Sequence, residues 1–340
     1  MSSVMERRGT PHSRAVLVKM AKLAVCLMVD DPAPVVNPLY YVETQVRGAV
    51  NPCQKSGEPM RASIPIELIE RFAELIERFE ARGKFSVVPY PAGLGAITDG
   101  WSGADQGKID RWLWIARQRI EPRMDITPEM LTHTLALDLG TGRMLPECER
   151  DWSYHQDEES LTAYITRALA ILRSAGFDAN GVTSPWDFGK PVEDAYAKAI
   201  RRAQTAVYNR DRSWFFLHSD FDPNGRRSYV VFRDGEGRVV SIVSKWGDEL
   251  WQTMESPATD RGYIDTVADA YLDSAGKTGP LVNLLRVQTP IVFHTHWQSL
   301  YSNGRYTGLR ALERVFERID RNWAGKVEWK KCSELAEEIV

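Results

Sequence analysis

Titratable side chains follow apolar runs at two places far apart in the chain. Asp30 and Asp31 come directly after the apolar run 23–29, and His294 and His296 follow the apolar segment 289–293. Two adjacent carboxylates can divide the work of holding a cation and of accepting a proton. The two histidines alternate along an extended segment, so both side chains point to one face, which suits a metal ligand beside a proton donor.

A further histidine lies in the segment 129–138, which has two interpretations. In the first, His133 is a metal ligand that follows Glu129 by four residues. In the second, Thr127 is the N-cap of a helix and the proline after it is the first helical residue. Glu129 and His133 would then be neighbours on the surface of that helix, away from any metal.

Hydrophobic periodicity predicts the elements that carry these residues. Apolar runs predict strands at 23–29, 84–90, 181–185, 214–217, 229–232, 239–243, 289–293 and 327–329. The 3.6-residue period predicts helices at 66–82, 105–120, 160–175, 192–207, 264–272 and 309–319, with a closing helix from Ser333.

Strands and helices alternate along the chain, apart from one β-hairpin around the turn 233–237. This order predicts an α/β protein with a mainly parallel sheet, open or closed as a barrel. We expect a flexible N-terminal tail at 1–20 and a single domain at 21–340. In such folds the reactive residues gather at the carboxyl ends of the strands.

Composition excludes several other classes of protein. The net charge of −3 argues against a protein that grips nucleic acid. The 4 cysteines form no CxxC pair, which excludes a zinc knuckle and indicates a reducing compartment. The most apolar stretch is too short to span a membrane and lacks the features of a signal peptide. We therefore expect a cytoplasmic protein without a nucleic-acid or membrane partner.

The order of the motifs resembles the polysaccharide deacetylase (NodB-like) family, whose members fold as an irregular parallel (β/α) barrel. Leu-Met-Val-Asp-Asp at 27–31 is similar to the first motif of the family, and Glu-Met-Leu-Thr-His-Thr at 129–134 is similar to the second. Thr-Ser-Pro-Trp at 183–186 resembles the third motif, and Ile-Val-Phe-His at 291–294 resembles the last. The resemblance covers most of the chain and implies the same barrel with a β-hairpin insertion.

Two positions depart from the family pattern. Leu137 stands where the second motif has another histidine, and Thr183 stands where the third motif has an arginine. Asp138, His155 and His296 are the candidates for the missing metal ligand, and we include His296 in the expected site.

The resemblance implies a metal-dependent hydrolase with a divalent ion, usually zinc. Asp30 would be the base, Asp31 and His133 would be ligands, and His294 would protonate the leaving group. The expected substrate is a carbohydrate that carries N- or O-acyl groups. The residues expected to bind it are Pro185, Trp186, Asp187 and Trp297.

Two other functions remain open from the sequence. The missing ligand and the missing arginine favour a degenerate relative that binds a glycan without turnover. A glycoside hydrolase on a similar barrel would instead use two carboxylates, such as Asp31 and Asp187.

Overall fold

A computed structural model describes residues 22–235 and 237–340, so the expected tail at 1–20 lies outside the described residues. The strand β1 (Leu23–Asp30) lies in the middle of a parallel sheet with the order β10-β1-β2-β3. Its partners are β2 (Gly83–Val87), β3 (Met124–Pro128) and β10 (Ile291–His296). The short strand β11 (Val327–Trp329) pairs with the beginning of β1. The continuous apolar sequence of β1 fits a strand that is covered on both faces.

A second sheet has the order β6-β7-β9-β8. The strands β6 (Gly181–Thr183), β7 (Arg212–Ser219) and β9 (Gly237–Ser244) are parallel, and β8 (Tyr229–Asp234) forms the expected antiparallel hairpin with β9. Isolated parallel bridges between Glu129 and Thr183 and between Trp246 and Phe293 connect the two sheets. The protein is therefore an α/β fold with a parallel central sheet, as expected.

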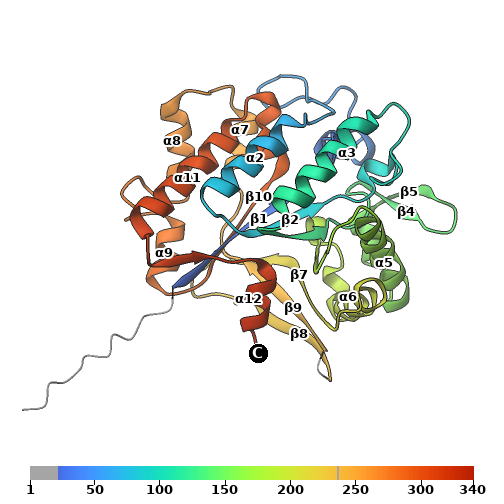
Figure 1. Cartoon of the computed structure of the whole chain (residues 1–340). Coiled ribbons are helices and arrows are strands. Elements are labelled where there is room, and N and C mark those ends of the chain that lie inside the picture. Colours follow the sequence, from blue (N-terminus) through green and yellow to red (C-terminus); the bar gives the residue numbers. More distant parts are fainter. Residues whose placement is uncertain (1–21, 236) are drawn as a thin grey trace, which may run out of the picture.

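Helices cover the outer faces of both sheets (Figure 1). The helices α2 (Glu67–Arg78), α3 (Gln106–Ile115) and α11 (Thr307–Trp323) lie along the first sheet, and α5 (Glu158–Ser174) and α6 (Glu193–Tyr208) lie beside the second. The remaining α-helices are α1 (Pro38–Tyr41), α4 (Glu149–Ser153), α7 (Gln252–Glu255), α8 (Arg261–Asp269), α9 (Pro280–Arg286), α10 (Trp297–Tyr301) and α12 (Cys332–Glu338). Within the described ranges, no helix is both long and apolar enough to cross a lipid bilayer.

The two faces of β1 pack into different apolar clusters, because successive side chains of a strand point in opposite directions. Val25, Leu27 and Val29 pack against the covering helices. Ala24, Cys26 and Met28 face inward, where they meet side chains of β7, β9, β10 and α12. Asp30 is the next residue in this inward series, so β1 delivers its carboxylate to the inner side at the carboxyl end of the sheet.

Two local features differ from the sequence-based expectations. Residues 124–128 form β3, paired with β2, so the interpretation that starts a helix at Thr127 is wrong. A second hairpin, formed by β4 (Leu135–Asp138) and β5 (Arg143–Cys148), follows the segment that carries His133. Both differences place His133 in a loop at the carboxyl end of β3.

Candidate metal centre

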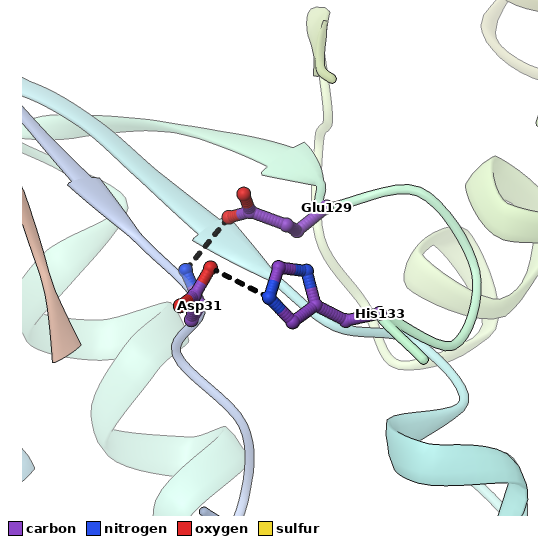
Figure 2. Close-up of side chains that lie close together, drawn as sticks. All are labelled: Asp31, Glu129 and His133. Carbon is purple, nitrogen blue, oxygen red and sulfur yellow. Dashed lines mark hydrogen bonds and ion pairs between the residues drawn. The ribbon is translucent and has the colours of Figure 1, made fainter. Parts of the chain in front are cut away.

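Asp31, Glu129 and His133 converge at the carboxyl ends of β1 and β3 (Figure 2). One ligand atom from each residue can be chosen so that all three lie within 4.8 Å of one another. The His133 Nε2 atom is 3.2 Å from the Asp31 Oδ1 atom, and the Asp31 backbone N–H donates a hydrogen bond of 2.7 Å to Glu129 Oε2. All three side chains are buried. The short distance favours the interpretation of His133 as a ligand.

The backbone around this group adopts conformations that are unusual for residues with a side chain. Asp31 has a φ angle of 68° and His133 has a φ angle of 61°, both in the left-handed region. Such conformations persist only where the surrounding contacts hold them, and they are frequent at functional sites.

The carboxylate of Glu149 holds the loop that presents His133. Its Oε1 atom accepts hydrogen bonds from the backbone N–H groups of Leu131 (3.0 Å) and Thr132 (2.9 Å) and from the Tyr164 hydroxyl (2.7 Å). Its Oε2 atom accepts a hydrogen bond of 3.0 Å from the backbone N–H of His133. Glu149 is fully buried, so these four donors are the contacts that compensate for removing its charge from water.

The donor set and the local charge both suit a divalent cation. Two carboxylates and one imidazole are ligand types that zinc and related ions accept. Burial lowers the pKa of His133, which keeps the imidazole in the neutral form that binds metals. Burial and the charges on Asp30 and Asp31 raise the pKa of Glu129 well above its usual value. A bound cation would favour the ionised form of Glu129, so the residues fit a metal ion.

Asp30 lies beside the group and is paired with a buried lysine. The Lys84 ammonium group contacts Asp30 Oδ1 and donates to Ser86 Oγ (2.6 Å) and Thr183 Oγ1 (2.8 Å). Burial alone would raise the pKa of Asp30, but the charges on Lys84, His296 and His294 outweigh it and hold that pKa below its usual value. Asp30 is therefore a carboxylate at neutral pH.

His296 is level with Asp30 on the neighbouring strand β10, because the two residues are partners in the parallel register. Its Nδ1 atom is 2.8 Å from Asp248 Oδ2. Asp248 also accepts hydrogen bonds from the Thr295 and Ser299 hydroxyl groups. Burial alone would lower the pKa of His296, but the Asp248 hydrogen bond and the charges on Asp31, Asp248 and Asp30 raise it to about 10. His296 is thus an imidazolium at neutral pH.

His294 lies two residues earlier on β10, level with Met28, at the same end of the sheet as Asp30. This confirms the expectation that Asp30 and His294 share one end of the parallel sheet. The His294 Nδ1 atom is 2.8 Å from the Ser244 hydroxyl. Burial lowers the pKa of His294 to about 4, so its imidazole is neutral at pH 7.

Comparisons with known proteins identify the fold. No family model matches the sequence, and no curated protein is significantly similar to it. Among solved structures, a proposed polysaccharide deacetylase from Mycobacterium smegmatis matches with a TM-score of 0.51 and 14% identity, over 93% of this chain and 90% of the other. The protein has a polysaccharide deacetylase-like fold.

Two further solved structures are more distant. A 4-alpha-glucanotransferase from Thermococcus litoralis has a TM-score of 0.44 and 15% identity, over 93% of this chain and 41% of the other. A CE4 family pseudoenzyme from Bacillus anthracis has a TM-score of 0.41 and 9% identity, over 94% of this chain and 66% of the other.

The residues expected to bind substrate have different surroundings. Trp186 is 37% exposed, and its ring lies against His133 with the centroids 4.6 Å apart. Pro185 is buried, and Asp187 forms an ion pair of 3.0 Å with Lys190 at the surface. Trp297 has no exposed surface, because it packs against Phe72 and Phe85 in the apolar core, and it cannot contact a substrate there.

The other candidates for the third ligand lie outside the group. Asp138 is at a turn of the β4–β5 hairpin, where it accepts backbone hydrogen bonds from Gly140 and Thr141. His155 is exposed, and His296 is bonded to Asp248. Leu137 is buried in β4, and its backbone N–H donates to the Tyr164 hydroxyl.

Sequence reasoning missed four functional candidates: Glu129 as a ligand, Glu149, Lys84 and Asp248. Two of them left a signal. Lys84 is a charged residue within the strand-like run 84–90, and β2 is buried along its whole length, where an unpaired charge is unusual. Asp248 follows the strand β9 shortly after its end, as Asp30 and Asp31 follow the apolar run 23–29. Glu149 left no signal, since only the folded loop brings its partners together.

Proposed function

We propose that the protein is a divalent-metal-dependent hydrolase that removes N- or O-acyl groups from a carbohydrate. The observation that carries this proposal is the buried group of Asp31, Glu129 and His133, with Asp30 and His296 beside it at the carboxyl ends of β1 and β10. A deacetylase-like fold supports it, because the same strand ends carry the motifs that resemble the family.

Asp31, Glu129 and His133 are the residues that would hold the metal ion. When bound, a divalent ion such as zinc supplies a Lewis acid that polarises an acyl carbonyl and makes a water molecule easier to deprotonate. Glu129 takes the place of the ligand that Leu137 cannot supply. This donor set contains more carboxylate than a site with two histidines, so it favours harder divalent ions more than that site does.

Asp30 and His296 divide the proton transfers in this proposal. Asp30 is ionised and accepts a proton from the attacking water. His296 is protonated at neutral pH and donates its proton to the leaving amine or alcohol. In this proposal the acid is His296 and not His294. His296 is level with Asp30 and carries a proton at pH 7, whereas His294 is neutral.

Exposed aromatic rings beside the metal centre support a carbohydrate as the substrate. Trp186 lies against the ring of His133 and is partly exposed to solvent. Phe221 is 48% exposed and packs against Trp246, with its ring 6.5 Å from that of His294. Flat apolar rings next to polar groups suit the apolar face and the hydroxyl edges of a sugar ring.

We also propose that the strands close into the irregular barrel expected from the sequence. The two single bridges, Glu129 with Thr183 and Trp246 with Phe293, join β3 to β6 and β9 to β10, and so support a ring of strands. Inward side chains of β1, β7, β9 and β10 pack together in the apolar cluster on the inner side, which also supports closure.

The test is release of acetate from N-acetylated chito-oligosaccharides and from O-acetylated sugars, with zinc, cobalt, nickel or manganese added in turn. Asp30→Asn and His296→Gln should each retain the metal and lower turnover by roughly 10² to 10⁴-fold, because each removes one proton-transfer group. His294→Gln is the matched control for His296→Gln and should lower turnover less.

Two results would contradict the proposal. A folded, metal-loaded wild-type protein that releases no acyl group from any of these substrates would leave glycan binding without turnover as the better account. A larger loss in His294→Gln than in His296→Gln would return the role of the acid to His294.

A further inference from the structure

Lys84 is an ammonium group held against Asp30 in the interior of the protein. Its side chain has 0% exposed surface and extends from β2 into the space between the two sheets. It forms an ion pair with Asp30 and donates to Ser86 Oγ at 2.6 Å and to Thr183 Oγ1 at 2.8 Å. The centroid of the Phe216 ring lies 5.0 Å from the ammonium nitrogen.

These contacts exclude a direct chemical role for Lys84. An ammonium group has three N–H donors, and the three oxygen partners use all of them. A substrate cannot reach a side chain without exposed surface, so Lys84 neither attacks a substrate nor protonates one. Its effect must pass through Asp30.

The contacts also fix which oxygen of Asp30 stays available. Lys84 and the Ser86 hydroxyl both contact Oδ1, and the Ser86 hydroxyl is also 3.1 Å from the Val29 carbonyl oxygen. Among the residues that the structure describes, no hydrogen bond is formed to Asp30 Oδ2. Oδ1 is therefore anchored, and Oδ2 is the atom that remains to accept a proton.

Charge balance gives the lysine a second effect. Asp30 lies next to Asp31, and the Asp31 backbone N–H donates to Glu129 Oε2, so three buried acidic side chains lie close together. Without Lys84, Asp30 would lose the cation that contacts it, which is costly for a carboxylate removed from water.

We propose that Lys84 is the positioning residue of the base Asp30. Its positive charge, supplied from β2, takes the place of the arginine that the deacetylase pattern has at the position of Thr183. The contact of 2.8 Å between Lys84 and Thr183 shows that a side chain from either position can occupy this space. This inference rests on the proposed function, because it requires Asp30 to act as the base.

The experiment compares Lys84→Met with the double variant Lys84→Met/Thr183→Arg. Lys84→Met removes the charge and should lower acetate release by roughly 10²-fold or more while the metal still binds, since the ligands are unchanged. The double variant places a positive charge on β6 instead, and it should release acetate at least about tenfold faster than Lys84→Met. Lys245→Met is the matched control, because Lys245 is also buried but donates to the backbone carbonyls of Asp222 and Arg226. It should keep its acetate release.

A structural role alone would not produce this recovery, because the arginine enters from another strand. The inference is overturned if Lys84→Met hydrolyses as well as wild type. It is also overturned if the folded, metal-loaded double variant is no more active than Lys84→Met.

Thermal unfolding separates this inference from the proposed function. Asp30→Asn, Lys84→Met and their combination form a double-mutant cycle that needs no substrate and no metal. If the charge of Lys84 balances that of Asp30, the loss of melting temperature in the combined variant should be smaller than the sum of the losses in the two single variants. The reason is that no unpaired buried charge remains in the combined variant. Additive losses would overturn the inference even if wild type proves to be a deacetylase. Strong coupling in a protein without acyl release would overturn the proposed function, and Lys84 would then only anchor Asp30 without serving a base.

Discussion

His294 and His296 have different hydrogen-bond partners, and this difference contributes to the opposite shifts of their pKa values. His294 is bonded to the Ser244 hydroxyl and is neutral, whereas His296 is bonded to the Asp248 carboxylate and carries a proton. A histidine near carboxylates is the group through which such a site responds to pH. The proton donor of the proposed reaction therefore depends on Asp248.

Replacement of Asp248 by Asn should lower the pKa of His296 from about 10 toward its ordinary value of 6.5. The reason is that the hydrogen bond to the carboxylate and its negative charge favour the imidazolium. NMR titration of the His296 ring in the metal-free protein measures this pKa. Asp320→Asn, at an exposed position of α11, should leave it unchanged. A wild-type His296 that titrates near 6.5 would show that the pair with Asp248 does not form.

The same shift predicts how stability depends on pH. Because the pKa of His296 is raised in the folded protein, its contribution to stability is complete below pH 6.5 and is lost as the pH rises through about 10. The free energy of unfolding should therefore fall between these values more in wild type than in Asp248→Asn. Urea titrations at several pH values measure this free energy. If it changes with pH equally in wild type and in Asp248→Asn across this range, the assignment is contradicted.

At the scale of the elements, one carboxylate on α4 shapes the connection between β3 and β4. Glu149 accepts hydrogen bonds from three consecutive backbone N–H groups, and the third of these belongs to His133. The hairpin of β4 and β5 brings α4 back to this loop. The hairpin of β4 and β5 thus contributes to the site, because it positions α4, whose Glu149 holds the loop with His133.

Glu149→Gln should destabilise the protein by about 2–4 kcal/mol, because a buried charged acceptor of several hydrogen bonds is lost. It should also weaken metal binding, because an amide nitrogen cannot accept from the His133 N–H. Urea unfolding and metal titration measure the two effects. Glu159→Gln, at an exposed position of α5, should change stability by less than about 0.5 kcal/mol. Unchanged metal affinity in Glu149→Gln would mean that the hydrogen bonds of the Glu149 carboxylate are not needed to hold His133 in place for metal binding.

The sequence predicted most elements because their patterns are strong. The apolar run of β1 and the periodic apolar residues of α2 and α5 gave their type and approximate bounds correctly. Residues 124–128 were ambiguous, because Thr127 and the proline after it also fit the start of a helix. Pairing with β2, which places Thr127 beside Ser86, overrides that local preference.

The site was predicted in part, for reasons that concern register and loop shape. The spacing of His294 and His296 shows that both face one side, but not which of them is level with Asp30. That depends on the register between β1 and β10, which no local pattern contains. The proximity of Glu129 to Asp31 likewise depends on the pairing of β3 with the sheet and on the loop that follows it.

At the scale of the whole molecule, the inner side changes from apolar to charged along the strands. Cys26 and Met28 of β1 lie in the apolar cluster that α12 covers, and Asp30 lies beyond them among charged groups. Leu335 and Ala336 of α12 pack into this cluster. The helix α12 lies beside β7 and β9 (Figure 1). On this inner side, the apolar cluster thus precedes the candidate site along the strands, and the site lies at their carboxyl ends, as is usual for parallel α/β folds.

Leu335→Ala should therefore lower the free energy of unfolding by about 2–4 kcal/mol, because it leaves a cavity in a packed cluster. Metal affinity should stay the same, since the ligands lie at the opposite ends of the strands. Val340→Ala removes an exposed side chain of the same chain end and should have little effect on either quantity. A clear loss of metal affinity in Leu335→Ala would show that the two ends are coupled.

The central claim is that Asp31, Glu129 and His133 hold one divalent ion. Titration calorimetry of zinc into the metal-free protein tests it most directly, with Asp31→Ala, His133→Ala and the exposed His155→Ala measured in parallel. We predict that wild type and His155→Ala bind one ion per chain, and that Asp31→Ala and His133→Ala do not bind it. A wild-type protein that takes up no zinc, cobalt, nickel or manganese, or an ion that still binds to Asp31→Ala, would contradict the account.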